Sequence, residues 1–203
     1  SISQRPNLMP ILGLLEEKGD EIFANADSVI VEVDMDKDII KKAVALAKQY
    51  NKKLYGVVSN MSIAVERRDF LKHFDCFICN QLEAGMLFME DYADKSPEEL
   101  RDILSKRVIL GKIPAMIVTM GGNGAVYADV NGEKGICPPQ RVRVKDTTGA
   151  GDAFCAGVAS GLTYGKTLSE AVEIGSRLAA SVITSSENVC PRFLPEEFGI
   201  TLD

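Results

Sequence analysis

The sequence has 203 residues, of which 46% are hydrophobic, and it carries a formal net charge of −6. A chain of this length and composition can bury a sizeable core, so we expect a single domain over residues 1–203. The negative charge and the lack of any block of lysine or arginine argue against nucleic acid or an anionic membrane as the main partner. No apolar run approaches the roughly 18 residues of a membrane span, and five scattered cysteines suit a reducing compartment, so we expect a cytoplasmic protein.

Apolar residues recur in turn at helical and at strand spacing along the chain. In chain order they predict a helix over residues 10–26, a strand over 29–33, a helix over 39–50 begun by Asp36 or Asp38, a strand over 54–58, a helix over 63–74 and a strand over 75–79. There follow a helix over 81–89, a helix opened by Ser96 and Pro97, strands over 115–119, 125–128 and 141–144, and helices over 153–162 and 168–183. Such alternation indicates βαβ units and a largely parallel sheet, the mark of an α/β fold.

Three stretches with candidate binding residues each follow an expected strand. They are Asn80, residues 119–124 and residues 146–152. In a parallel sheet flanked by helices, ligands bind at the carboxyl ends of the strands. We therefore expect these stretches to lie at one edge of the sheet and to form the functional site.

The last of these stretches carries the strongest signal. Residues 146–154 read Asp-Thr-Thr-Gly-Ala-Gly-Asp-Ala-Phe, where a helix is expected to begin. A glycine turn between a strand and a buried helix lets free backbone N–H groups at the helix start face an anion. Asp152 lies in the first turn, and its carboxylate would repel that anion unless it has a chemical task. The simplest task is that of general base on a hydroxyl that attacks a bound phosphate; a capping acid without chemistry is the alternative.

This run resembles the C-terminal signature of the ribokinase-like (PfkB) family of sugar and nucleoside kinases. The resemblance implies a three-layer α/β/α sandwich with a mostly parallel sheet, of which this chain would be the later part, without the N-terminal portion and the lid. It implies that Asp152 is the catalytic base, and that the turn of Gly149, Ala150 and Gly151 supplies the anion hole through the amides of residues 150–152. It further implies ATP and Mg²⁺ as requirements and a small-molecule sugar or nucleoside as acceptor.

The stretch Asn-Gln-Leu-Glu at 80–83 resembles a second motif of the family. The resemblance implies that Asn80 and Glu83 belong to the ATP site and that Glu83 helps to hold Mg²⁺ through water. Mg²⁺ keeps several waters and takes few direct carboxylates, so one acid at some distance is chemically sufficient. A capping box, with Asn80 as the cap and Glu83 at the third helical position, is the alternative.

The turn Thr-Met-Gly-Gly-Asn-Gly at 119–124 lies between two expected strands. In the family a Thr/Lys-x-Gly-x-x-Gly turn here contacts the nucleotide phosphates, and Thr119, Gly121 and Gly124 match it. The Asn-Gly pair also predicts a hairpin turn without a ligand. Both interpretations can hold, because a glycine turn can admit a phosphate and join two strands.

Two further resemblances concern ions and the acceptor. The family often binds a monovalent cation near the residues matched by Asp146 and Thr148, which implies K⁺; turn chemistry at Asp146 is the alternative. Residues 179–192 lie where relatives bind the nucleoside end of ATP, and their Glu-Asn-Val-x-Pro most resembles pseudouridine kinases. A zinc site at Cys76 and Cys79 is disfavoured, because this pair lies in a strand and lacks a second pair.

The sequence thus predicts ATP-dependent phosphotransfer to a hydroxyl of a sugar or nucleoside. The first alternative is a non-catalytic nucleotide-binding fragment that lacks the acceptor site, because the chain starts without methionine and matches only the later part of the family. A dinucleotide-binding protein is a weaker alternative, since no G-x-G-x-x-G follows a strand. Many relatives dimerise through the lid, so a homodimer is also considered.

Overall fold

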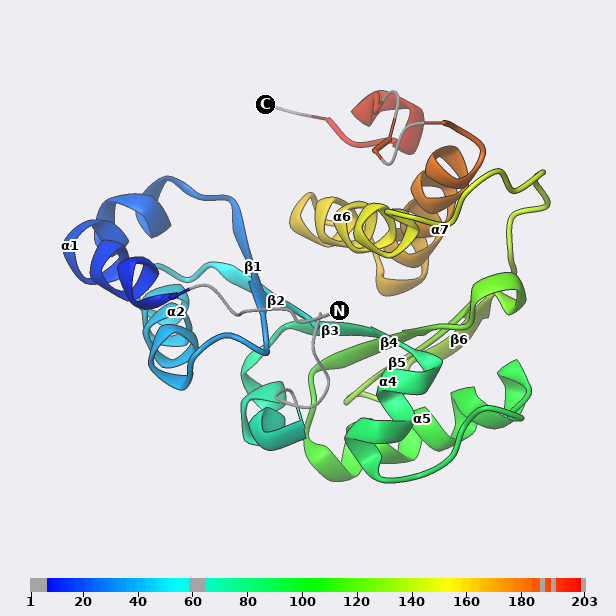
Figure 1. The fold of residues 1–203 in the computed structure, drawn as a ribbon, viewed down its shortest axis with the longest axis horizontal. Coiled ribbons are helices and arrows are strands. Elements are labelled where there is room, and N and C mark those ends of the chain that lie inside the picture. Colours follow the sequence, from blue (N-terminus) through cyan, green and yellow to red (C-terminus); the bar gives the residue numbers. More distant parts are fainter. Residues whose placement is uncertain (1–6, 59–64, 187–188, 191–192, 202–203) are drawn as a thin grey trace.

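The structure, a computed structural model, describes residues 7–58, 65–186, 189–190 and 193–201. The elements follow the chain in the order α1 (Met9–Asn25), β1 (Ser28–Glu32), α2 (Lys37–Gln49), β2 (Lys53–Val57), the 3₁₀ helix η1 (Val65–His73), β3 (Cys76–Asn80), α4 (Gln81–Phe88), α5 (Pro97–Gly111), β4 (Ala115–Thr119), the 3₁₀ turn η2 (Gly121–Asn123), β5 (Ala125–Asp129), β6 (Lys134–Cys137), α6 (Ala150–Thr163), α7 (Leu168–Ile183) and η3 (Pro195–Phe198). Figure 1 shows their arrangement.

One six-stranded sheet joins these elements, in the order β1-β2-β3-β4-β5-β6. The first four strands are parallel, and β5 and β6 continue the sheet as antiparallel strands. The expected mostly parallel sheet is therefore confirmed. The antiparallel pairing of β4 with β5 also confirms that the glycine turn between them joins two neighbouring strands.

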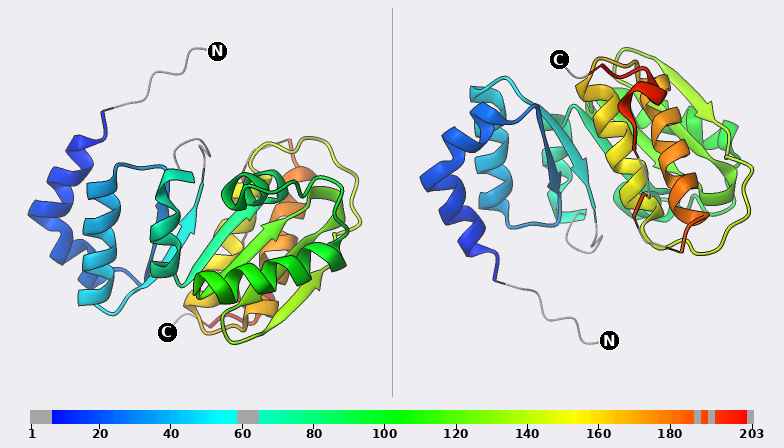
Figure 2. Two further views of the ribbon diagram at one scale, coloured as in Figure 1. Left: turned by 90° about the horizontal axis from the view of Figure 1, so that it is seen from below. Right: turned by 90° about the horizontal axis from the view of Figure 1, so that it is seen from above.

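Helices cover both faces of the sheet, because successive residues of a strand point to opposite sides. Ile78 and Ile117 belong to a core that includes buried residues of α6 and α7. Phe77 and Met116, each one residue earlier in its strand, belong to a core that includes residues of α2, α4 and α5. Figure 2 shows α6 and α7 on one side of the strands and α4 and α5 on the other. The three-layer α/β/α arrangement is thus confirmed.

Helices α6 and α7 pack at backbone contact. A Cβ atom on Gly157 would lie 2.8 Å from the Cα of Gly175, and one on Gly161 would lie 2.9 Å from the Cα of Ala171. Real Cβ atoms do not approach backbone so closely, so the small residues predicted over 153–162 are what lets the two helices meet. The position of α6, which carries the candidate base, is therefore fixed by α7.

Side chains cap three of the helices as the sequence indicates. Asn80, Ser96 and Thr167 start α4, α5 and α7, and each forms a capping box with the glutamate three residues later. Helix α6 begins differently. Its N-cap is Gly149, in the left-handed region at φ +80, and no side chain caps it.

One expected strand is absent, and one observed strand was not expected. Residues 65–73 are helical as expected, in the form of a 3₁₀ helix; residues 63 and 64 lie outside the described residues. Residues 141–144 alternate but form no strand, since all four are exposed and none pairs with the sheet. No pattern in the sequence predicted β6, a four-residue strand with one buried residue, Cys137.

The remaining expectations concern thiols and membranes. Cys76 and Cys79 are buried in β3, and burial raises the pKa of both thiols, as expected of core cysteines. Within the described ranges, no cluster of three His, Cys, Asp or Glu residues could hold a metal ion. Nor do those ranges contain a helix that is long and apolar enough to cross a membrane.

Candidate functional site

The carboxyl ends of β3 and β4 bring two candidate residues together. Asn80 ends β3 and is the register partner of Thr119, which ends β4. The Asn80 side chain accepts a hydrogen bond from the Glu83 amide at 2.9 Å, and the Asn80 amide donates to Glu83 Oε2 at 2.7 Å. The capping box considered from the sequence is therefore present, and it holds the Glu83 carboxyl beside this strand end.

Glu83 is a half-buried acid in an unfavourable setting. Burial raises the pKa of its carboxyl, against the opposing effect of the hydrogen bonds with Asn80. A carboxylate whose charge is disfavoured by burial gains most from a cation or a hydrogen-bond donor nearby. Capping and a role in a binding site are thus compatible at Glu83.

The turn after β4 is shaped by its glycines. Gly121 and Gly124 have φ values of +54 and +85, in the left-handed region. A Cβ atom on Gly124 would lie 2.1 Å from the carbonyl oxygen of Cys137 and 2.9 Å from the nitrogen of Pro139. Only glycine fits there, so the turn is pressed against the loop that follows β6. A Cβ atom on Gly121 would meet nothing within 4 Å, which leaves the front of the turn open.

The start of α6 offers free backbone donors. The Ala150 amide donates to the Thr147 carbonyl oxygen at 3.2 Å, and the Ala153 amide donates to that of Gly149 at 3.0 Å. The amides of Gly151 and Asp152, between them, donate to no group in the described part of the chain. The anion hole predicted over residues 150–152 therefore has two uncommitted donors, because the Ala150 amide already has an internal partner.

A cavity of about 520 Å³ lies between the glycine turn and the start of α6. Thr119, Gly121 and Gly124 line it on one side, and Ala150 and Gly151 line it on the other. Two motifs that are 26 residues or more apart in the sequence thus face the same space. The sequence predicted that these two stretches lie together, whereas Asn80, the third predicted stretch, does not line this cavity.

Other candidate residues line two adjoining cavities. One of about 370 Å³ is lined by Gly149 and Asp152, so it lies on the other side of the α6 start. Another of about 670 Å³ is lined by Asn80 and shares Thr119 and Gly121 with the central cavity. Glu83, Asp146 and Thr148 line none of the three.

Electrostatics link the two candidate acids across the site. Cys155 lies one turn after Asp152 in α6, and burial raises the pKa of its thiol to about 12. The negative charges of Asp152 and Glu83 both add to this rise. Each of these carboxylates, one from α6 and one from the start of α4, is therefore close enough to act on the Cys155 thiol.

Asp146 orders the turn that precedes α6. Its Oδ1 accepts hydrogen bonds from the amide and from the hydroxyl of Thr148, both at 2.9 Å. These bonds, that from the amide first, lower the pKa of the Asp146 carboxyl. The turn chemistry considered from the sequence is therefore present.

Sequence reasoning missed part of one wall of the central cavity, while Ala179, Ala180 and Ile183 of that wall lie in the segment 179–192 that it had singled out. The loop after β6 and one face of α7 close it, through Pro139, Gln140, Arg141, Val142, Val144, Ser176, Ala179, Ala180 and Ile183. The Lys145 amide donates to the Ile183 carbonyl oxygen at 2.8 Å, which ties this loop to the end of α7. Residues 179–192 were expected to meet a nucleoside, but 187–188 and 191–192, which carry most of the Glu-Asn-Val-x-Pro pattern, lie outside the described residues.

Comparison with known proteins gives a consistent result. Residues 4–191 match the model of the pfkB family carbohydrate kinase. A guanosine-inosine kinase from Exiguobacterium acetylicum is 34% identical over 195 residues, which cover 93% of this chain and 61% of that kinase. The pseudouridine kinase of Escherichia coli is 35% identical over only 69 residues, which cover 34% of this chain and 22% of that kinase.

The solved structures agree at the level of the fold. An Arabidopsis thaliana ribokinase, solved in complex with ribose and ATP, matches with a TM-score of 0.71 at 21% identity, over 84% of this chain and 54% of that one. The chain therefore spans between about half and three-fifths of the length of the guanosine-inosine kinase and the ribokinase.

Proposed function

Because this chain belongs to the pfkB family of carbohydrate kinases, we propose that it transfers the γ-phosphoryl group of ATP to a hydroxyl of a sugar or nucleoside. The observation that carries this proposal is the cavity in which the glycine turn after β4 faces the uncommitted amides of α6. Backbone donors at a helix start suit a phosphate group. The exposed carboxylate of Asp152 stands beside them, on the far side of the same helix start.

The two sides of the α6 start suit the two substrates. We propose that the nucleotide occupies the central cavity, with its phosphates against the glycine turn, and that the acceptor hydroxyl approaches from the side of Asp152. The hydroxyl oxygen then attacks the γ-phosphorus, the bond to the β–γ bridging oxygen breaks, and ADP leaves. Asp152 takes the hydroxyl proton, and the amides of Gly151 and Asp152 stabilise the charge on the transferred group.

The residues around Glu83 fit Mg²⁺ as a metal held mainly by phosphate oxygens and water. Glu83 is a carboxylate whose charge is disfavoured by its surroundings, and the described residues hold no cluster able to bind a metal by itself. Mg²⁺ commonly takes one or two carboxylates beside substrate phosphates. When bound, the ion would neutralise phosphate charge, and Glu83 would orient it through water.

For K⁺, Asp146 and the Thr148 carbonyl remain the proposed ligands, beside the turn that Asp146 already orders.

A purine nucleoside is the first acceptor to test. The relative that covers 93% of this chain is a guanosine-inosine kinase, whereas the pseudouridine kinase matches about a third of it. The cavity beside Asp152 has apolar walls that include Leu178 and Phe193, and such walls suit a nucleobase better than a bare sugar.

The experiment is phosphate transfer from γ-labelled ATP with Mg²⁺ and K⁺. The acceptors are guanosine, inosine, adenosine, pseudouridine, ribose and fructose. We expect the wild type to transfer phosphate to one of these acceptors. In Asp152→Asn this transfer should fall on the order of 10² to 10⁴-fold, while the ATP affinity stays within about twofold of wild type. Equal loss of ATP binding in the variant would make Asp152 structural and contradict its role as base.

A non-catalytic nucleotide-binding fragment is the second candidate. The coverage of the relatives favours it, because the chain spans 61% of the guanosine-inosine kinase. In that case ATP binds, as calorimetry would show, while no acceptor is phosphorylated.

The homodimer also remains a prediction. Strand β1 is an edge strand on which Ile30 is 50% exposed, and sedimentation velocity over a range of concentrations measures self-association.

A further inference from the structure

The central cavity has very few charged side chains in its lining. It is lined by backbone, small residues and apolar side chains, and among the described residues Arg141 is its one charged side chain. Among the described residues, the lining of the adjoining cavities adds acids, Asp152 in one and Glu90 and Asp91 in the other, and no lysine or arginine. The chain as a whole carries a formal charge of −6. Among the described residues that line these cavities, Arg141 is therefore the one cation that a polyanion would meet.

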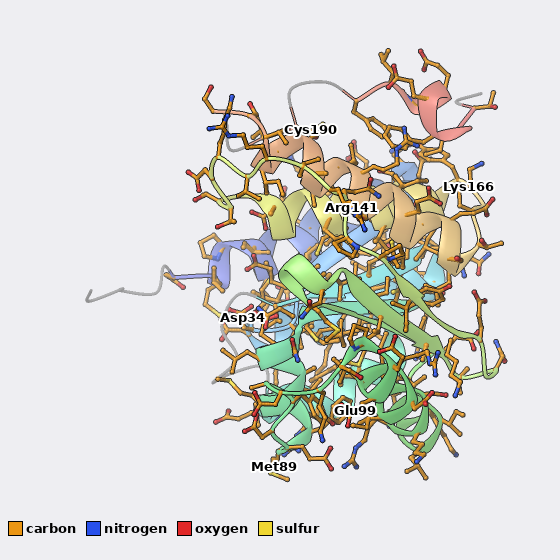
Figure 3. The ribbon with its side chains drawn as sticks, turned by 90° about the vertical axis from the view of Figure 1, so that its right-hand side faces the viewer. Asp34, Met89, Glu99, Arg141, Lys166 and Cys190 are labelled. Carbon is orange, nitrogen blue, oxygen red and sulfur yellow. The ribbon has the colours of Figure 1, made fainter. Side chains whose placement is uncertain are left out.

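Arg141 is available for such a ligand. It is exposed, and its guanidinium forms no ion pair or hydrogen bond within the described part of the chain. Figure 3 shows Arg141 between α7 and the strands of the sheet. A guanidinium offers five donors in a fixed fork that matches phosphate oxygens.

The loop that carries Arg141 is held at both ends. Its beginning, at Pro139, is pressed against Gly124 of the glycine turn, and its end is tied by the Lys145 amide to the Ile183 carbonyl oxygen. Arg141 lines the cavity, whereas Arg143, two residues later in the same loop, does not. A cation that is held beside a phosphate site in advance loses less entropy on binding than a free surface lysine.

We propose that Arg141 binds the phosphate chain of the nucleotide and is the main protein cation for it. This inference rests on the proposed function, because it takes the central cavity as the nucleotide site. It assigns to the loop after β6 a role in recognising charge, in addition to closing the cavity. No motif marked this residue in the sequence.

The test compares Arg141→Gln with Arg143→Gln, a matched substitution two residues away. Separate calorimetric titrations measure the binding of ATP, of ADP and of adenosine, the last as the nucleotide without its phosphates, each in the presence of Mg²⁺. We expect Arg141→Gln to weaken ATP and ADP binding on the order of ten- to a hundredfold, as loss of a charge-assisted hydrogen bond does. Adenosine binding stays within about twofold of wild type, and Arg143→Gln binds all three ligands as wild type does.

Two further measurements sharpen the test. Arg141→Lys keeps the charge and loses the fork, so its ATP affinity should lie between those of wild type and Arg141→Gln. Added salt should weaken ATP binding less in Arg141→Gln than in wild type, because one screened charge pair is gone. Thermal unfolding should not differ between the variants, since Arg141 is exposed and unpaired within the described residues.

The outcomes separate this inference from the proposed function. Unchanged ATP affinity in Arg141→Gln, or an equal loss of adenosine affinity, overturns the inference while phosphate transfer by the wild type still supports the kinase. The expected binding pattern without any transfer supports Arg141 and contradicts the catalytic proposal. A wild-type chain that binds no ATP overturns both.

Discussion

At the scale of single residues, two acids at the same sheet edge begin helices in contrasting ways. Glu83 is the third residue of α4 and closes a capping box with Asn80. Asp152 is the third residue of α6, is exposed, and has no such partner among the described residues. Local structure accounts for the first acid and leaves the second without a structural task. Substitutions at Glu83 must therefore separate capping from charge.

Glu83→Gln makes that separation, because glutamine can close the same capping box without a charge. We expect phosphate transfer to fall about ten- to a hundredfold if Glu83 orients Mg²⁺, as is typical of groups that act through a metal's outer ligands. Steady-state kinetics at several Mg²⁺ concentrations measures this effect. Glu99→Gln is the matched control, since Glu99 closes the box at the start of α5. Unchanged transfer in Glu83→Gln would reduce Glu83 to a helix cap.

Glu83 and Glu99 should make opposite contributions to the dependence of stability on pH. The pKa of Glu83 is raised from 4.5 by burial, so its stabilisation is present below that value and lost as pH rises through the raised pKa. The pKa of Glu99 is lowered by the hydrogen bond from the Ser96 amide, so its stabilisation is present above 4.5 and lost as pH falls through the lowered pKa. As pH is raised from 4 to 7, about the range in which carboxyl groups titrate, the melting temperature of Glu83→Gln minus that of wild type should increase. The same difference for Glu99→Gln should decrease. Equal trends in the two variants would contradict the assignment.

Residues with local signatures could be predicted from the sequence, and those without could not. Gly121, Gly124 and Asn80 follow strands and belong to recognisable turn or cap patterns, so their place at the sheet edge was expected. Arg141 belongs to no binding motif. Its position depends on how the loop after β6 folds back against Gly124, which is a contact between segments distant in sequence.

At the scale of elements, the pairing of α6 with α7 decides where the candidate base lies. The helices touch through Gly157 and Gly175, with no room for a side chain between them. Glycine lowers helix propensity, so its presence within α6 and α7 is explained by this close approach and not by the helices themselves. Packing of the two helices thus takes precedence over local preference.

Gly157→Ala tests this packing. The new Cβ atom would lie 2.8 Å from the Cα of Gly175, so the helices must move apart, at a cost of about 1–3 kcal/mol. Gly13→Ala is the control, because Gly13 lies in α1 and a Cβ atom there meets nothing within 4 Å. That substitution should stabilise by about 0.5–1 kcal/mol through helix propensity. Urea denaturation measures both, and a Gly157→Ala protein as stable as wild type would contradict the close contact.

Elements with strong periodicity were predicted within a few residues, whereas weakly patterned ones were not. The helix over 168–183 matches α7, and the strand over 115–119 matches β4. Residues 141–144 alternate like a strand, but their neighbours in space are the glycine turn and α7, so they find no strand to pair with. Strand β6 has one buried residue and depends on β5 for its conformation. Pairing partners, which sequence spacing does not specify, decided both cases.

At the scale of the whole molecule, ligand binding should be visible as stability. A ligand that binds only the folded state at a hundred times its Kd adds about 2.7 kcal/mol. For a chain of this size each kcal/mol shifts the melting temperature by roughly 2–4 °C. We therefore expect ATP with Mg²⁺ to raise it by about 5–10 °C in a thermal melt followed by circular dichroism. NAD at the same concentration should leave it unchanged; a shift with NAD alone would favour the dinucleotide-binding alternative.

The bare start of α6 has a consequence for motion as well as for chemistry. Three other helices close their first turn with their own side chains, whereas α6 leaves the amides of Gly151 and Asp152 without a partner among the described residues. A first turn held so loosely should fray, and its amide hydrogens should exchange with solvent faster than those of α4 or α7. A bound phosphate would act as the missing cap and slow that exchange. The order of this turn would then be a property that the protein acquires from its substrate.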